Sequence, residues 1–171
     1  MINKNNKLKK DNKLQDIVSN NTKVTYYKGV GGLKKIYEQT LKDKNPIFAL
    51  TANILEIDPE LRNWLTEKYV KKRKENKIFA KVISPKTGLA KEYLKNDKDG
   101  YRKTLLIPKD KFPISIEINI FGNKVGLMSY KKNELMGTVI ESKEIAKSMR
   151  VFFDLAWEKA QDYQKESKDR I

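Results

Sequence analysis

The sequence contains neither cysteine nor histidine. Without cysteine the chain forms no disulfide, has no thiol nucleophile and offers no thiolate ligand to a metal. Without histidine it has no imidazole general base, no histidine nucleophile and none of the imidazole ligands on which most zinc sites depend. These two absences exclude large classes of enzyme before any motif is considered.

Long hydrophobic runs are also missing, since no stretch approaches the ~18 apolar residues that a membrane span requires. The first residues, 1–13, are rich in asparagine and lysine and lack the apolar segment of a signal peptide. We therefore expect a cytoplasmic protein with no membrane partner.

Arginine is scarce although the chain is strongly basic. Lysine and arginine together number 37 against 22 acidic residues, which gives a net charge of +15, yet only five of the 37 are arginines. A net charge of this size indicates nucleic-acid binding, but sequence-specific readers rely on arginine for bidentate contacts. Abundant lysine, asparagine and isoleucine are also typical of an AT-rich genome, so both interpretations stay open.

With 171 residues the chain fits one domain, large enough to bury roughly 70% of its unfolded surface. Residues 1–22 are predicted to be a basic leader, flexible or partly helical. Residues 23–160 are predicted to form the folded domain, and residues 161–171 a polar tail.

Two short apolar runs, residues 47–52 and 78–83, predict buried strands. Asp58, Pro59 and Glu60 predict a helix start between them, with a capping aspartate, a first-turn proline and a glutamate that the helix dipole favours. A strand, a crossover helix and a second strand form the βαβ unit of a parallel or mixed sheet. Such sheets bind ligands at their strand ends.

The second half adds strands and a final helix. Isoleucines at 114, 116, 118 and 120 alternate with Ser115, Glu117 and Asn119, which predicts a half-buried strand. Residues 124–129 complete a hairpin, residues 135–141 form another strand, and Ser142 caps the last helix. An apolar stripe on that helix is expected to be core: Ile145, Ala146, Met149, Phe152, Phe153, Ala156, Trp157 and Ala160. The predicted fold class is α/β, a single mixed sheet flanked by helices.

These segments together resemble a known family. The likeness begins with Tyr26-Tyr27-Lys28-Gly29 and ends with Phe152-Phe153-Asp154-Leu155-Ala156-Trp157. Between them it is carried by residues 32–38, the strand at 47, and residues 69–73, 81–85, 102–108 and 118–125. Over residues 24–157 the chain is similar to the effector domain of TrmB-type transcriptional regulators, and this resemblance implies a phospholipase D-like fold.

The resemblance implies regulation rather than catalysis. Phospholipase D-like enzymes need an HxKxxxxD motif with histidine as the nucleophile. Aligned on the hairpin, that motif places Ile114, Ile116 and Phe121 at its three positions, and the chain has no histidine to run the reaction.

Two differences from the family limit which of its functions we expect in this chain. The 22 residues before the domain correspond to the end of a helical linker rather than a DNA-reading winged helix, and the chain stops soon after Trp157, before the β-rich region that helps to form the sugar site. We therefore expect a non-catalytic regulatory or ligand-sensing domain, homodimeric, that acts with a separate DNA-binding protein or is the remnant of a DNA-binding regulator. A small-molecule effector is expected, and sugar sensing is not favoured.

Polar residues at the predicted strand ends are the candidate ligand site. They are Thr51, Asn53, Ser84, Arg102 and Ser129. Arg102 is the leading candidate because a guanidinium can hold an anionic group bidentately, although a surface ion pair would explain it too. No cofactor, metal or catalytic residue is expected.

Two other classes of function remain. A non-specific nucleic-acid-binding protein would use the basic leader and the helix end formed by Lys71, Lys72, Arg73 and Lys74, with binding that weakens steeply in salt. An enzyme based on carboxylates and a metal is the least favoured, because helix capping explains Asp58 and Glu60. Glu56 and Glu117 have no evident carboxylate partner.

Overall fold

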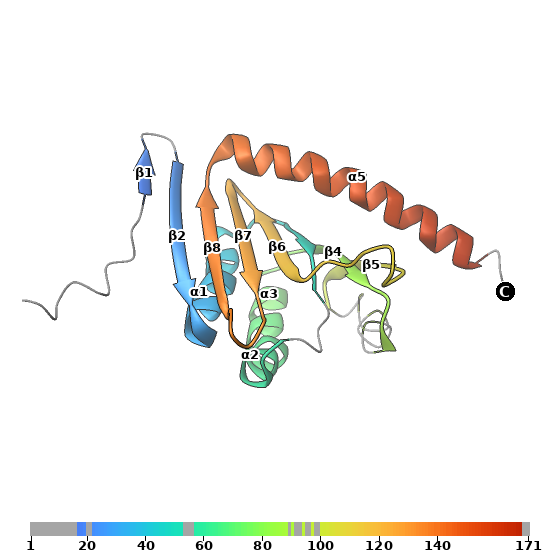
Figure 1. Ribbon diagram of the computed structural model, residues 1–171, viewed down its shortest axis with the longest axis horizontal. Coiled ribbons are helices and arrows are strands. Elements are labelled where there is room, and N and C mark those ends of the chain that lie inside the picture. Colours follow the sequence, from blue (N-terminus) through green and yellow to red (C-terminus); the bar gives the residue numbers. More distant parts are fainter. Residues whose placement is uncertain are drawn as a thin grey trace, which may run out of the picture.

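The computed structural model describes residues 17–19, 22–52, 57–88, 90, 94, 97 and 100–168. One sheet contains all eight described strands (Figure 1). The strands are β1 (Ile17–Ser19), β2 (Thr22–Lys28), β3 (Ile47–Leu50), β4 (Ala80–Pro85), β5 (Arg102–Ile107), β6 (Ile116–Phe121), β7 (Lys124–Ser129) and β8 (Met136–Glu141). The helices are α1 (Gly29–Asp43), α2 (Pro59–Trp64), the π-helical η2 (Leu65–Tyr69), α3 (Val70–Glu75) and α5 (Lys143–Lys168).

The sheet is mixed, with strand order β1-β2-β8-β7-β6-β3-β4-β5. Strands β3, β4 and β5 are parallel to one another, and β6 joins them by pairing antiparallel with β3. The remaining pairs, from β1 to β6, are antiparallel. The predicted α/β class, the single mixed sheet and the βαβ unit from β3 to β4 are confirmed.

Helices cover both faces of the sheet. One hydrophobic core lies under α1, α2 and α3 and includes Leu33, Ile36 and Leu61; the other lies under α5 and includes Phe153 and Trp157. Along β6 the side chains alternate between these two cores. Ile118 and Ile120 therefore face α5, while Glu117 and Asn119 face the α1–α3 layer and are buried. The half-buried strand predicted from the isoleucine alternation is wrong in this respect, because both of its faces are covered.

The predicted helix start at Asp58 is confirmed. The Asp58 carboxylate accepts hydrogen bonds from the backbone N–H groups of Glu60 and Leu61. The helix then passes through the π-helical turn η2 before it continues as α3. Turns of this kind are frequent at functional sites. Both end residues of η2, Leu65 and Tyr69, line the cavity described below.

The final helix departs from the prediction in two ways. Ala146, Phe153, Trp157 and Ala160 are buried as expected, but Phe152 is 61% exposed and Ile145 39% exposed, since α5 meets the sheet along a narrow line only. The helix also continues through residues 161–168, which were assigned to a polar tail. The amide of Gln164 donates a 2.8 Å hydrogen bond to the Leu106 carbonyl of β5, and this contact holds the end of the helix on the sheet.

The leader prediction is also corrected in part. Residues 17–19 form β1, which pairs antiparallel with β2, rather than a flexible or helical segment. Residues 1–16, 20 and 21 lie outside the described part of the chain.

Candidate ligand-binding pocket

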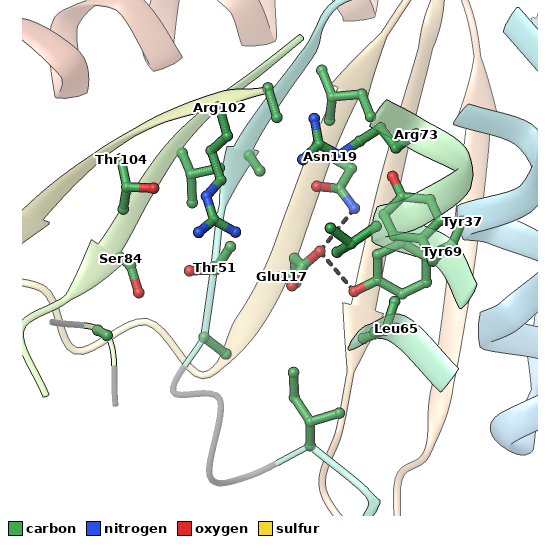
Figure 2. Close-up of a pocket in the computed structure, with 18 residues that line it drawn as sticks. Tyr37, Thr51, Leu65, Tyr69, Arg73, Ser84, Arg102, Thr104, Glu117 and Asn119 are labelled. Carbon is green, nitrogen blue, oxygen red and sulfur yellow. Dashed lines mark hydrogen bonds between the residues drawn. The ribbon is translucent and has the colours of Figure 1, made fainter. Parts of the chain in front are cut away.

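A cavity of about 170 Å³ lies between the α1–α3 layer and strands β3, β4, β5 and β6 (Figure 2). Much of its wall is apolar and is formed by Ile47, Ala49, Ile57, Leu65, Val70 and Val82. Its polar side chains come from both layers. The helices contribute Tyr37, Tyr69 and Arg73, and strands β4, β5 and β6 and the residue after β3 contribute Thr51, Ser84, Arg102, Thr104, Glu117 and Asn119. An apolar cavity with a few convergent polar groups is the usual form of a small-molecule site.

The structure brings three of the five predicted ligand residues together in this cavity. Thr51 follows β3, Ser84 lies near the end of β4, and Arg102 opens β5. Asn53 lies outside the described residues. Ser129 is on β7 away from the cavity lining, and its hydroxyl donates a 3.2 Å hydrogen bond to Glu134.

Arg102 combines the two roles that the sequence left open. Its Nε lies 2.6 Å from the Asp97 carboxylate, so the side chain is ion-paired, and its guanidinium extends toward the same space as Thr51 and Glu117 (Figure 2). Asp97 also accepts hydrogen bonds from the backbone N–H and the hydroxyl of Thr104. The carboxylate thus fixes Arg102 and Thr104 together at one end of the cavity.

Glu117 is the principal residue that the sequence analysis did not select. Its carboxylate is buried on β6, where Oε1 accepts 2.8 Å hydrogen bonds from the Tyr37 hydroxyl and the Asn119 amide (Figure 2). Burial raises the pKa of the Glu117 carboxyl, and the hydrogen bonds from Tyr37 and Asn119 oppose that shift. Glu117, for which the sequence shows no carboxylate partner, is therefore a hydrogen-bonded group on the cavity wall.

Tyrosine hydroxyls extend this network: Tyr37 and Tyr69 line the cavity, and Tyr130 lies behind Tyr37. Tyr37 shares a hydrogen bond with Tyr130, and the Tyr69 hydroxyl lies 2.8 Å from that of Thr40. Burial, together with the charge of Glu117, raises the pKa values of Tyr37 and Tyr130 well above 10. Burial raises that of Tyr69 to about 12. All three phenols are therefore neutral hydrogen-bonding groups near neutral pH, which rules them out as general bases.

Arg73 requires a correction, because it was grouped with the nucleic-acid-binding lysines. Its side chain is 3% exposed, and its guanidinium donates to the backbone carbonyls of Ile78, Gly100 and Tyr101 at 2.7, 2.5 and 2.9 Å. The guanidinium therefore ties α3 to the two segments that precede β4 and β5. Only Lys71, Lys72 and Lys74 of the predicted group are exposed.

The described residues offer no metal site, since they contain no group of three or more acidic side chains able to hold an ion. At the positions aligned with HxKxxxxD, Ile114 and Ile116 are half-buried and Phe121 is fully buried in the core. None of these three side chains can act as nucleophile, base or acid. No described helix is long and apolar enough to cross a membrane.

Comparison with known proteins supports the fold and leaves the family open. No family model and no curated protein matches the chain. Among solved structures it is similar to TrmBL2, an archaeal chromatin protein whose structure is described as showing a novel mode of DNA binding, with a TM-score of 0.56 and 15% identity. That similarity covers 80% of this chain and 52% of TrmBL2, so the chain spans about half the length of that protein.

A second similar structure is NucT from Helicobacter pylori, with a TM-score of 0.56 and 11% identity over 80% of this chain and 96% of NucT. At these identities both likenesses concern the fold alone. They are consistent with the phospholipase D-like fold that the sequence resemblance implies.

Proposed function

We propose that this chain is a non-catalytic regulatory domain, similar to the effector part of TrmB-type regulators, that senses a small molecule in the cavity on the α1–α3 face. The observation that carries the proposal is the convergence of Thr51, Ser84 and Arg102 with the buried Glu117 around one apolar cavity. Strands far apart in the sequence contribute these groups. Such convergence is typical of a binding site and unusual for a packing defect.

The cavity limits the size of the ligand. A volume of about 170 Å³ is close to that of an engineered ~150 Å³ cavity that holds benzene, and it is below the ~300 Å³ of a typical drug-sized pocket. The ligand is therefore a small metabolite with an apolar body. In the cavity wall Glu117 favours a hydrogen-bond donor or a cation, whereas Arg102 favours an acceptor or an anion.

The regulatory part of the proposal rests on the resemblance and on one structural neighbour. TrmBL2 is an archaeal chromatin protein with a novel mode of DNA binding, and this chain covers about half of it. We propose that a separate DNA-binding protein supplies DNA recognition, that the ligand alters the association between the two, and that the complex is cytoplasmic. The homodimer expected from the sequence stays a prediction, which the molar mass in solution tests.

Thermal unfolding in the presence of small metabolites tests the proposal. The panel should contain amino acids, amines and short carboxylic acids, each at a concentration far above a micromolar Kd. A ligand at 100 times its Kd stabilises the folded state by about 2.7 kcal/mol, which raises the Tm of a domain of this size by several degrees. Arg102→Ala should abolish the shift, whereas Ser129→Ala, outside the cavity, should keep it.

Non-specific nucleic-acid binding is the second candidate, and the exposed lysines Lys71, Lys72 and Lys74 of α3 favour it. Binding through these phosphate contacts should ignore sequence and fall by orders of magnitude between about 50 and 200 mM salt. Replacing the three lysines with glutamine should then remove it without affecting ligand binding in the cavity.

A further inference from the structure

The face of the sheet opposite the pocket carries a row of cations on aromatic rings. In register across three neighbouring strands, Phe48 of β3 lies beside Lys81 of β4, and Lys81 lies beside Lys103 of β5. These positions alternate with pocket residues along each strand, so their side chains project toward α5. Two residues of α5 contact this row, Trp157 at Lys81 and Arg150 at Phe48.

Three positive groups converge on two rings in this row. The Lys81 ammonium lies 5.3 Å from the centre of the Trp157 ring and 5.8 Å from that of Phe48. The Lys103 ammonium lies 5.8 Å from the Trp157 ring, and the Arg150 guanidinium carbon lies 4.1 Å from the Phe48 ring. Cation–π contacts of this kind hold the charges in place without neutralising them.

Within the described part of the chain, none of the close ion pairs involves Lys81, Lys103 or Arg150. Like charges directly opposite each other on neighbouring strands are destabilising, and here Lys81 and Lys103 are such a pair. The arrangement therefore favours an anion as its partner, and phosphate is the anion that lysine and arginine clusters bind most commonly.

An exposed aromatic pair precedes the two lysines. Phe79 and Tyr101 lie two residues before Lys81 and Lys103, and their rings meet edge to face at 5.6 Å. Phe79 is 36% exposed and Tyr101 42% exposed. Since Ile78 and Ala80 on either side belong to the α1–α3 core, Phe79 projects to the opposite face, the face of the cation row.

The buried Arg73 holds this aromatic pair. Its guanidinium binds the carbonyl of Ile78, directly before Phe79, and those of Gly100 and Tyr101. Tyr101 itself has a positive φ of 51°, a conformation that costs free energy in a non-glycine residue and is held here by that contact. Two exposed rings are thus fixed beside three cations.

We propose that this surface, made of Phe79, Tyr101, Lys81, Lys103 and Arg150, binds single-stranded nucleic acid. Bases stack on the Phe79 and Tyr101 rings, and Lys81, Lys103 and Arg150 contact the phosphates. Aromatic platforms flanked by cations bind single strands with little sequence preference, because every base has a face that can stack. In a duplex these base faces are covered by neighbouring pairs, so the surface discriminates against double strands.

Fluorescence anisotropy of the full chain with a labelled oligothymidylate tests the proposal, with the same strand in a duplex as the comparison. The wild type should bind the single strand more tightly than the duplex at about 50 mM salt. Lys81→Gln/Lys103→Gln should weaken binding at least tenfold and lower the slope of log K against log salt by about 1.4, for two lost contacts at about 0.7 each. Phe79→Leu should weaken single-strand binding about fivefold or more and leave the salt slope unchanged.

Lys71→Gln/Lys72→Gln is the matched control, since it removes the same charge from the exposed side of α3. It should retain most of the affinity. Removing Lys81 and Lys103 relieves their repulsion but also removes their contacts with the Phe48 and Trp157 rings, so the unfolding temperature of that variant is measured beside its affinity to show that it is folded. Arg150→Gln on α5 provides a second test that leaves the strands unaltered, with an expected drop of about 0.7 in the slope.

Three results would overturn the proposal. One is that the wild type does not bind the oligothymidylate even at low salt. Another is that it binds the duplex as tightly as the single strand, which indicates backbone contacts alone. The third is that the α3 control loses as much affinity as the Lys81/Lys103 variant, which places the nucleic acid on α3.

Discussion

The hydroxyl of Tyr37 donates a 2.8 Å hydrogen bond to Oε1 of the buried Glu117. This contact joins α1 to β6 across 80 residues of sequence and fixes a carboxylate on the wall of the only cavity that we assign a function. A carboxylate in an apolar surrounding is costly unless it is hydrogen-bonded, and here Tyr37 and Asn119 supply those bonds.

The pH dependence of stability should report the burial of Glu117. Its pKa is raised, so between the ordinary carboxyl pKa and the raised value the folded protein holds a proton that the unfolded chain releases. Stability from this group is therefore highest in acid and is lost as the pH rises through that window. Glu117→Gln should remove the loss, so its stability relative to the wild type should grow as the pH rises from acid through the window above the ordinary carboxyl pKa.

Urea unfolding of both proteins across that pH range makes the comparison. Glu134→Gln is a suitable control, because Glu134 is exposed on the loop after β7. A stability difference between Glu117→Gln and the wild type that does not vary with pH would show that the Glu117 pKa is not raised.

Arg73→Met should destabilise the fold by about 3 kcal/mol or more. The substitution leaves three backbone carbonyls without their donor, and a hydrogen bond to a charged group is worth roughly 1.5–3 kcal/mol. Lys74→Met, on the exposed side of the same helix, should change stability by less than about 0.5 kcal/mol. Equal denaturation midpoints for the two variants would contradict a clamping role for Arg73.

Gly137→Ala should destabilise by about 1–3 kcal/mol, because α1 packs directly on the β8 backbone. A methyl group at Gly137 would overlap the Ile36 side chain and would lie 3.0 Å from the Leu127 carbonyl oxygen. Gly31→Ala on α1 meets nothing within 4 Å and should instead stabilise by about 0.5 kcal/mol. An equal decrease in Tm for both variants would contradict the close packing of α1 on β8, which positions Tyr37.

The sheet could be predicted from local patterns because each strand has its own signal. The runs at 47–52 and 78–83, the capping Asp58 and the isoleucine alternation of β6 all depend on neighbours in sequence, and the structure contains each element. Thr51 and Ser84 share the pocket because the parallel strands β3 and β4 bring their carboxyl ends to one edge of the sheet. Arg102 instead opens β5 at the other edge, and its guanidinium extends toward the same space (Figure 2).

What the sequence did not reveal depends on contacts between distant residues. Glu117 seemed isolated because its partner Tyr37 lies 80 residues away on a helix that covers β6. Arg73 seemed to belong to a charged helix end because its carbonyl partners lie in loops up to 28 residues further along. Phe152 fits an apolar helix stripe, but it lies one residue, about 100° round the helix, from the buried Phe153 and so faces away from the sheet.

Alanine methyl NMR of the full chain tests ligand sensing in the pocket most directly. Ala49, Ala80 and Ala90 line the cavity, whereas Ala146 and Ala160 belong to α5 on the other face of the sheet and serve as internal controls. The account predicts that at least one amino acid, amine or short carboxylic acid shifts the first three methyl signals at millimolar concentration and leaves the other two unchanged. Ser84→Leu, which fills the cavity, should abolish these shifts. Ligand sensing in the pocket would be contradicted if no such compound shifted the methyl signals of the pocket alanines. It would also be contradicted if the signals of Ala146 and Ala160 shifted in their place.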